Sequence, residues 1–213
     1  MTAEKIAADF SKYRIKTIEG DFCECKRKTV RLPGKDRGIT IVSFGTTFGN
    51  FAPEAAVACL GSLHRNVLKP GETALFSLDS TQDTEMIQSA YGNNITAQFF
   101  LNGLNYACGL AGLKGLDPDA FSYEVRFNKE TKFVEMDLVS QSQQILTGGS
   151  DVPRVVLESG ESLRVGQSRK LSEYDWKDVF QQSGYEIETC LPDMSRQSRY
   201  NIWVVRAGPG GVV

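Results

Sequence analysis

The sequence predicts an α/β protein whose partly parallel sheet is interrupted by an inserted α+β lobe. Two near-continuous apolar runs, at 39–44 and 73–78, are typical of buried parallel strands. An amphipathic helix that opens at Pro53 lies between them, so the order strand, helix, strand indicates a parallel pair. An alternating hairpin pattern at 121–139 then breaks this order, which indicates the insertion.

The other elements follow from the spacing of apolar residues and from turn-forming residues at the element ends. Helices are predicted at 3–12, from Pro53 onward, and at 84–91, 96–113 and 172–184. Strands are predicted at 13–18, 39–44, 73–78, 121–127, 133–139, 155–157, 163–165, 185–190 and 200–206. We expect core segments at 1–81 and 171–213, with the inserted lobe at 82–170.

The charge balance argues against several classes of partner. The formal net charge is -2, with 24 Lys and Arg residues against 26 Asp and Glu residues, so no basic surface for nucleic acid is expected. No apolar run approaches the length of a membrane span, so we expect no membrane partner. The single basic cluster, at 26–37, lies in a segment that contains Gly and Pro, and we expect a solvated loop there.

The cysteine pattern gives no metal site. Five cysteines are scattered along the chain, namely Cys23, Cys25, Cys59, Cys108 and Cys190. Their odd number and the Cys23-x-Cys25 spacing do not match a zinc ribbon, and a single histidine, His64, excludes a histidine-rich site. Since the N-terminus also shows no apolar signal region, we expect reduced thiols and a cytoplasmic location.

Chemistry is expected at the carboxyl ends of the strands, where parallel sheets bind ligands. Asp21 follows the predicted strand 13–18, and its carboxylate is suited to accept a hydrogen bond from an adenine amine while Phe22 packs on the ring. A simple Gly-Asp turn is the alternative. The sequence shows no glycine-rich phosphate loop and no serine-elbow motif, so we assign no catalytic residue.

The segment 44–51, FGTTFGNF, is more informative. Gly45 allows close approach of the backbone to a ligand, and Asn50 offers the donor and the acceptor that a zwitterionic α-amino acid requires. A cap on the following helix is the alternative role for Asn50. Asp79 ends the next strand, where it either faces the same edge or caps a helix, and Tyr91 lies at the start of the lobe.

Seven short stretches share their order with one enzyme family. They are Gly20-Asp21-Phe22, FGTTFGNF at 44–51, Leu78-Asp79-Ser80, Ala90-Tyr91, Asn102-Gly103-Leu104, Val134-Glu-Met136 and RVGQSRK at 164–170. From about residue 3 to 206 the chain resembles the histidine-specific Nα-methyltransferases of ergothioneine biosynthesis. It also resembles their fungal relatives, the dimethylallyltryptophan N-methyltransferases of ergot-alkaloid pathways. The resemblance implies a Rossmann-like core that binds S-adenosylmethionine and an inserted lobe that binds an amino acid as its small-molecule substrate.

The resemblance also implies residue roles, position by position. The cofactor-binding residues would be Asp21 and Phe22, on the adenine side, and Gly45, near the methyl group. The substrate-binding residues would be Asn50 and Tyr91, at the amino-acid moiety, and Met136 and Ser168, at the side-chain pocket. Gly166 replaces the acidic residue that holds the imidazole in the histidine enzyme, so a larger aromatic substrate such as a tryptophan derivative is expected.

The match begins after the family's N-terminal substrate segment, its glycine-rich turn and its ribose-binding strand, so the expected core is incomplete. Two hypotheses follow. In the first, the chain methylates the α-amine of an amino acid in fungal secondary metabolism. In the alternative, it is a catalytically inactive, truncated methyltransferase that acts as a partner subunit or remnant. The loss of central strands exposes sheet edges, which favours a homo-oligomer.

Overall fold

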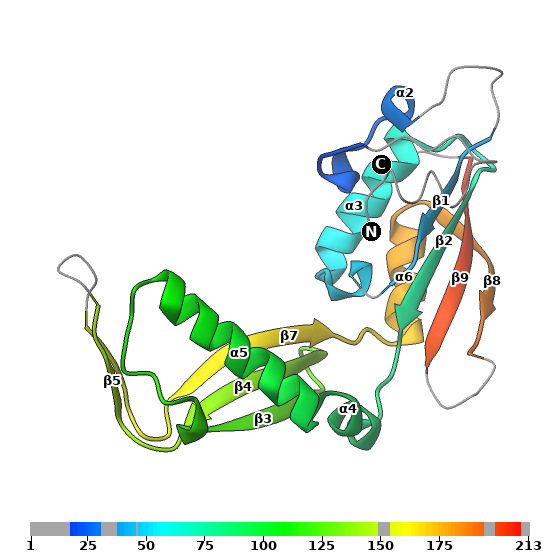
Figure 1. Ribbon diagram of the computed structural model, residues 1–213. Helices are drawn as coiled ribbons and strands as arrows, with labels where there is room; N and C mark the ends of the chain where they lie inside the picture. The colour runs from blue at the N-terminus through cyan, green and yellow to red at the C-terminus, as the bar shows by residue number, and fades with distance from the viewer. Residues whose placement is uncertain (1–17, 31–37, 46, 149–153, 194–198, 210–213) are drawn as a thin grey trace, which may run out of the picture. The chain divides into compact units, whose positions relative to one another are not determined.

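The computed structural model describes residues 18–30, 38–45, 47–148, 154–193 and 199–209 (Figure 1). The elements predicted at 3–12 and 13–18 therefore lie outside the described residues, apart from Ile18. The chain forms two compact units. Unit 1 comprises Met1–Leu78, Tyr174–Pro192 and Asn201–Val213, and unit 2 comprises Asp79–Glu173 and Asp193–Tyr200.

Unit 1 is built on a four-stranded sheet with the order β1-β2-β9-β8. The strands are β1 (Thr40–Ser43), β2 (Thr73–Asp79), β8 (Tyr185–Leu191) and β9 (Tyr200–Ala207). β1 and β2 pair in parallel, with Thr40 opposite Thr73, whereas β8 and β9 are antiparallel. The predicted parallel pair and the predicted final strands are thus confirmed.

Two helices, α3 (Pro53–Asn66) and α6 (Glu173–Gln182), lie on one side of this sheet (Figure 1). The core between helices and sheet is aromatic, and its rings are at most 2% exposed: Phe48, Phe76, Trp176, Phe180 and Trp203. Neighbouring ring centroids lie 5.2 Å apart for Phe48 and Phe76 and 5.6 Å apart for Phe180 and Trp203. Rings at such distances stabilise the unit beyond their burial alone.

The prediction that 39–44 is covered on both faces is wrong for the described residues. Val42 of β1 is 53% exposed and Phe44 is 64% exposed. The cause is that α3 and α6 cover the other face, onto which Ile41 and Ser43 point. The strand is therefore apolar on a face that nothing among the described residues of unit 1 shields.

The solvated loop predicted at 26–37 contains a short helix, α2 (Arg27–Val30), and a second short helix, η1 (Phe22–Glu24), precedes it. Arg27 is not a solvated loop residue, because its guanidinium donates hydrogen bonds to both carboxylate oxygens of Glu72, at 2.6 and 2.8 Å, and to the Val67 carbonyl. These bonds outweigh burial and lower the pKa of Glu72 to about 2. The cluster members at 31–37 lie outside the described residues.

The expectation that all five cysteines are reduced is also wrong. Cys23 and Cys59 form a disulfide that joins η1 to α3, with 36 residues of separation. Cys25, Cys108 and Cys190 form no disulfide, as expected. The odd number of cysteines did not reveal this pair. Because the expected cytoplasmic location rested partly on reduced thiols, the cysteine pattern no longer supports it.

Unit 2 is built on an antiparallel sheet with the order β3-β4-β7. Its elements are α4 (Thr84–Tyr91), α5 (Asn94–Leu110), η3 (Pro118–Ala120), β3 (Phe121–Asn128), β4 (Phe133–Ser140), β5 (Gln144–Leu146), β6 (Val155–Leu157) and β7 (Ser162–Arg169). Helix α5 crosses one face of the sheet (Figure 1). The predicted hairpin is confirmed, β5 was not predicted, and β7 is longer than predicted.

The two faces of this sheet differ in chemistry. The strand register places Met136 opposite Gly166 and Val134 opposite Ser168, on the face that α5 covers. On the other face, Asp137 is 2% exposed because Arg126 and Arg164 bind its carboxylate, at 3.1 and 2.5 Å. The alternation of side chains along the strands thus gives the sheet one apolar face and one charged face.

The helix starts illustrate local capping. Helix α5 begins at Asn94 because the Asn93 side chain accepts a hydrogen bond from the Thr96 amide, at 3.0 Å. The helix therefore begins two residues before, and ends three residues before, the helix predicted at 96–113. None of the described helices combines the length and apolar character needed to cross a bilayer.

Candidate functional site

The clearest arrangement of functional side chains lies in unit 2, around Tyr91. Its hydroxyl donates a hydrogen bond to the Ser168 hydroxyl at 3.1 Å. Its backbone carbonyl accepts one from the Tyr123 hydroxyl at 3.2 Å. Because Tyr91 ends α4 and Ser168 lies on β7, the bond between the two hydroxyls joins residues that are 77 positions apart in sequence. Two of the predicted substrate-binding residues are thus in direct contact.

A buried ion pair supports the same ring. Lys170 Nζ lies 2.5 Å from Asp79 Oδ2 and 5.0 Å from the Tyr91 ring centroid. Burial favours the neutral forms of both groups, but mutual attraction outweighs it, so the pKa of Lys170 is raised and the pKa of Asp79 is lowered. Asp79 also accepts a bond from the Thr81 amide at 3.0 Å, so its carboxylate is held in place rather than presented to solvent.

A cavity of about 290 Å³ adjoins this pair within unit 2. Its lining comprises Asp79, Thr81, Met86, Ile87, Ala90, Tyr91, Lys170 and Tyr200. The lining is mostly apolar, with one charged pair and two phenols at its wall. Such a composition suits a small ligand that carries an apolar body and a polar head.

Met136 lies on the face of the unit 2 sheet that α5 covers, as Ser168 does, but its neighbour there is Gly166. A Cβ atom added to Gly166 would lie 2.7 Å from Phe100 Cζ and 3.0 Å from Met136 Cε. Phe100 comes from α5 and stacks with Tyr123, with ring centroids 5.9 Å apart. The space beside Gly166 is therefore occupied by an aromatic ring and a thioether, and any larger residue at this position must displace Phe100.

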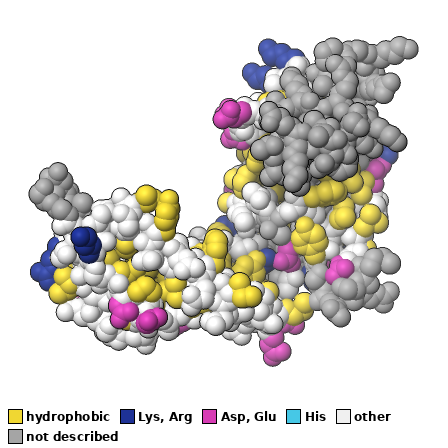
Figure 2. All heavy atoms as spheres, viewed as in Figure 1, with side chains coloured by type: hydrophobic (Ala, Val, Ile, Leu, Met, Phe, Trp, Pro, Cys, Tyr) yellow, Lys and Arg dark blue, Asp and Glu magenta, His cyan; other side chains and the backbone are white. Residues whose placement is uncertain are grey.

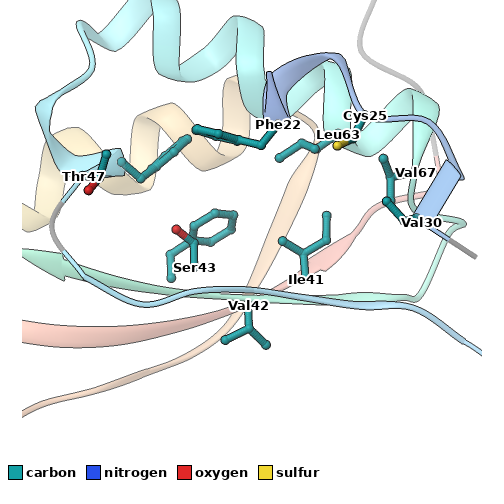
Figure 3. Close-up of a pocket in the computed structure, with 11 residues that line it drawn as sticks. Phe22, Cys25, Val30, Ile41, Val42, Ser43, Thr47, Leu63 and Val67 are labelled. Atoms are coloured by element: carbon teal, nitrogen blue, oxygen red, sulfur yellow. The ribbon is translucent and has the colours of Figure 1, made fainter. Parts of the chain in front are cut away.

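Unit 1 contains a second cavity, of about 270 Å³, between β1, α3 and the two 3-10 helices (Figure 3). The figure shows Ile41 and Ser43 pointing from β1 toward Phe22 and Leu63, with Val42 pointing away. The Phe22 ring is 46% exposed and stacks against Phe51, with centroids 6.0 Å apart. This ring is the one predicted cofactor-binding side chain that lines the cavity.

The other predicted residues of unit 1 lie at loop positions. Asp21 is exposed and caps η1, with its carboxylate accepting a bond from the Cys23 amide at 2.8 Å. Gly45 has φ +98 and donates its amide to the Ser77 hydroxyl at 2.9 Å, a backbone conformation that favours glycine. Asn50 is exposed and ends η2 (Phe48–Asn50), next to Phe51.

The lining of the unit 1 cavity fits only part of S-adenosylmethionine. A flat, largely apolar adenine ring suits the Phe22 ring, the aliphatic side chains and the hydroxyls of Ser43 and Thr47. The ribose diol and the methionine zwitterion require charged or strongly polar partners. None of the described residues that line this cavity carries a charge. The residues present therefore fit the adenine end of this cofactor.

The sequence predicted Tyr91, Ser168 and Met136 as substrate-binding residues, but it did not predict the residues that contact them. Lys170 lies in the shared stretch at 164–170, but no role was predicted for it. It follows Ser168 by two positions, so the alternation of a strand places it on the same face as Ser168. Phe100 and Tyr123 gave no signal of their own. Their contacts with the site depend on how α5 packs across β3 and β7. The residue pattern of α5 does not specify this contact between distant segments.

The fold of unit 1, with its partly parallel sheet and helical cover, is of the Rossmann-like methyltransferase class. Over residues 1–206 the chain matches the family described as "Histidine-specific methyltransferase, SAM-dependent". The chain belongs to this family, which confirms the resemblance seen in the sequence.

Individual relatives agree. The chain is 24% identical over 192 residues to N-methyltransferase imqF of Aspergillus flavus, which covers 88% of this chain and 51% of the relative. It is 30% identical over 165 residues to the histidine N-alpha-methyltransferase of Mycobacterium tuberculosis, covering 76% and 49%. It is 27% identical over 159 residues to 4-dimethylallyltryptophan N-methyltransferase easF of Aspergillus fumigatus, covering 71% and 47%. The chain spans about half the length of these relatives.

A solved structure supports the fold. The S-adenosylmethionine-dependent methyltransferase from Clostridium acetobutylicum aligns with a TM-score of 0.50 and 14% sequence identity. The alignment covers 97% of this chain and 70% of that protein. At this identity the likeness shows the fold alone, and that fold is a methyltransferase fold.

Proposed function

We propose that the chain provides the acceptor site and the adenine end of the cofactor site in an S-adenosylmethionine-dependent N-methyltransferase. The methyl acceptor is the α-amine of an amino acid with a large aromatic side chain, of the tryptophan type. The observation that supports this choice is that Phe100 and Met136 fill the space beside Gly166, where a carboxylate that binds histidine would otherwise lie. We place the reaction in fungal secondary metabolism, of the alkaloid-forming kind, since two of the relatives named above are fungal N-methyltransferases.

The lining favours an aromatic acceptor over histidine for an electrostatic reason. An imidazole side chain is bound best by a carboxylate or another hydrogen-bonding group. At Gly166 a glutamate would have its Cβ 2.7 Å from Phe100 Cζ, so such a carboxylate does not fit unless the ring moves. The Phe100 and Tyr123 rings offer stacking surface instead, which an indole uses well.

In methyl transfer, the main task of the protein is to align the acceptor amine with the methyl group. S-adenosylmethionine, when bound, supplies an electrophilic methyl group on a sulfonium, and the acceptor amine attacks it in line. In this proposal the Tyr91 and Ser168 hydroxyls hold the polar head of the acceptor, and Lys170 and Asp79 keep the Tyr91 ring in position. Such positioning needs no acid-base pair, because its contribution is orientation and exclusion of water. The role of Asn50 rests on the resemblance alone.

Calorimetric titration of the chain with L-tryptophan and with L-histidine tests the proposal. We expect tryptophan to bind at least about tenfold more tightly, since one well-placed aromatic contact amounts to about 1.4 kcal/mol. The double variant Gly166→Glu, Phe100→Ala should reverse this preference, because the carboxylate then has room. Tyr174→Ser, an exposed change in unit 1, is the matched control and should alter neither affinity. Equal affinities in the wild-type protein would contradict the proposal.

One observation favours a second candidate, the inactive partner subunit. The unit 1 cavity provides no charged partner for the methionine end among its described lining residues. Incubation with S-adenosylmethionine and the preferred acceptor, followed by mass spectrometry, separates the candidates. A methylated product supports the enzyme. Acceptor binding without any product supports the partner subunit.

A further inference from the structure

The outward face of α5 carries an apolar stripe that no element of unit 2 covers. Ile95, Phe99, Tyr106 and Leu110 are 84%, 70%, 69% and 74% exposed. Together with the exposed Asn102, they follow each other at intervals of four, three, four and four residues, which places them on one side of the helix. The opposite side of α5 is also apolar and packs on the sheet, where Cys108 is 7% exposed. A helix that is apolar on both sides is normally buried on both sides.

The stripe lacks any feature that would keep it in water. Helix α5 contains no Asp, Glu, Lys or Arg in its 17 residues. Figure 2 shows hydrophobic side chains over this helix among uncharged atoms. Four side chains of this size at these exposures present roughly 600 Å² of surface, the upper end of what monomers expose in one patch. Two such stripes in contact would bury roughly 1,200 Å² in total, which reaches the size of a specific interface.

The stripe is symmetric about its own centre. Ile95 and Leu110 lie equally far from the point midway between Asn102 and Gly103, and so do Phe99 and Tyr106. In an antiparallel pair of such helices, Ile95 faces Leu110 of the partner subunit, and Phe99 faces the partner's Tyr106. Aliphatic then meets aliphatic and aromatic meets aromatic. Asn102 and the partner's Asn102 meet near the two-fold axis, where two amides can each donate and accept.

Gly103 removes the steric obstacle to this pairing. A Cβ atom added at Gly103 would meet nothing within 4 Å, so the surface beside the axis is open and flat. Small residues at a crossing point let two helix backbones approach closely. Since neither helix carries charge, no like charges are brought together by the symmetry.

From these observations we propose that the stripe on α5, defined as Ile95, Phe99, Asn102, Tyr106 and Leu110, is the contact surface for a second copy of this chain. The two α5 helices pack antiparallel around a two-fold axis at Asn102 and Gly103. The proposal is independent of the methyl-transfer function, because none of these side chains belongs to the acceptor or cofactor site described above.

Light scattering coupled to size-exclusion chromatography measures the state directly. The wild-type chain at tens of micromolar should elute with twice the 23.5 kDa mass of one chain. Phe99→Ser should raise the dissociation constant of the dimer by at least about 30-fold, since a central aromatic anchor typically accounts for about 2 kcal/mol. Tyr174→Ser removes an equally exposed aromatic ring from α6 in unit 1 and should leave the dimer intact. Circular dichroism checks that both variants are folded.

A cysteine placed near the axis tests the geometry. Asn102→Cys should form a covalent dimer under mild oxidation, because close approach of the helices brings the two thiols together. Glu130→Cys, at the exposed turn between β3 and β4 in the same unit, should not exceed the wild-type background.

Three outcomes would overturn the proposal. The first is a wild-type chain that remains monomeric. The second is a dimer that survives Phe99→Ser. The third is a monomer whose α5 amides and side chains are protected in hydrogen exchange and surface labelling, which would show that another segment of the same chain covers the stripe.

Discussion

The two units differ in how firmly they hold the side chains assigned to the ligand. In unit 2, Tyr91 is fixed at its hydroxyl, its carbonyl and its ring face by three different residues. In unit 1, Asp21 and Asn50 lie at exposed loop positions, and only Phe22 lines a cavity. The difference teaches that the residues we propose for the acceptor are held by contacts within one unit, whereas those we propose for the cofactor lie mostly in exposed segments.

The two units can be followed separately, which makes the comparison testable. Both tryptophans of the chain, Trp176 and Trp203, belong to the core of unit 1. Tryptophan fluorescence therefore reports the unfolding of unit 1, and hydrogen exchange of the β4 amides reports unit 2. Changes that act on one unit should leave the other signal unchanged.

The largest effect is expected from Lys170→Met. This change leaves Asp79 without its cation in a largely buried position, and breaking such a pair typically costs about 3–5 kcal/mol. Protection of the β4 amides against hydrogen exchange should fall accordingly, while tryptophan fluorescence changes little. The double variant Asp79→Leu, Lys170→Met removes both charges and should lose much less. If the single and double variants were equally destabilised, the ion pair would not be what holds Tyr91.

Removing the disulfide should act on the other unit. The double variant Cys23→Ser, Cys59→Ser frees a loop with 36 residues of separation, and its closure entropy corresponds to about 3–4 kcal/mol. Urea unfolding followed by tryptophan fluorescence should shift to lower denaturant concentration. Cys190→Ser, which changes a cysteine of the same unit that lies outside the disulfide, serves as the control. An unchanged midpoint would show that the disulfide contributes nothing to unit 1.

A smaller effect is expected from acid. The Arg27 hydrogen bonds lower the pKa of folded Glu72 to about 2, below its ordinary value of 4.5. Since the folded-state pKa is the lower one, this stabilisation is fully present above about pH 4.5 and is lost as the pH falls toward 2. Arg27→Met should therefore destabilise unit 1 at pH 7 and have much less effect near pH 2. A constant difference between variant and wild type across this range would contradict the assignment.

The smallest effect is expected from Tyr91→Phe. The change removes one hydroxyl that bonds Ser168, and a single hydrogen bond contributes about 1 kcal/mol. Loss of the bond to Ser168 should lower the stability of unit 2 by about 1 kcal/mol, and loss of the proposed bond to the acceptor should raise the dissociation constant of the acceptor about fivefold. Tyr174→Phe provides the matched control in unit 1. A variant that binds the acceptor as well as the wild type would remove Tyr91 from the site.

Local signals predicted most of the fold. The β-branched run before Phe44, the proline at the start of α3 and the alternating hairpin each fix one element, because period and capping are short-range properties. Three features escaped prediction for one shared reason. They are the ion pair of Arg27 with Glu72, the disulfide of Cys23 with Cys59, and the exposed face of β1. Each depends on which distant segments come into contact, and a single sequence does not show which positions pair.

The candidate site shows the same limit. Tyr91 and Ser168 were predicted as substrate-binding residues because they lie in stretches shared with a known family, and the structure brings them into contact. Lys170, the residue after β7, contacts the Tyr91 ring, and Phe100 on α5 lies beside Gly166, but the sequence assigned a role to neither. Strand periodicity gave a hint of Lys170, but nothing in the sequence of α5 indicates that Phe100 fills the space beside Gly166.

The most direct test of the whole account concerns unit 1. Calorimetry should compare S-adenosylhomocysteine with 5′-methylthioadenosine, which keeps the adenosine and lacks the amino-acid end. Because the described cavity offers partners for adenine alone, we predict that both ligands bind, with affinities within a few-fold of each other. If neither ligand bound at millimolar concentration, or if S-adenosylhomocysteine bound far more tightly, the partial cofactor site would be contradicted.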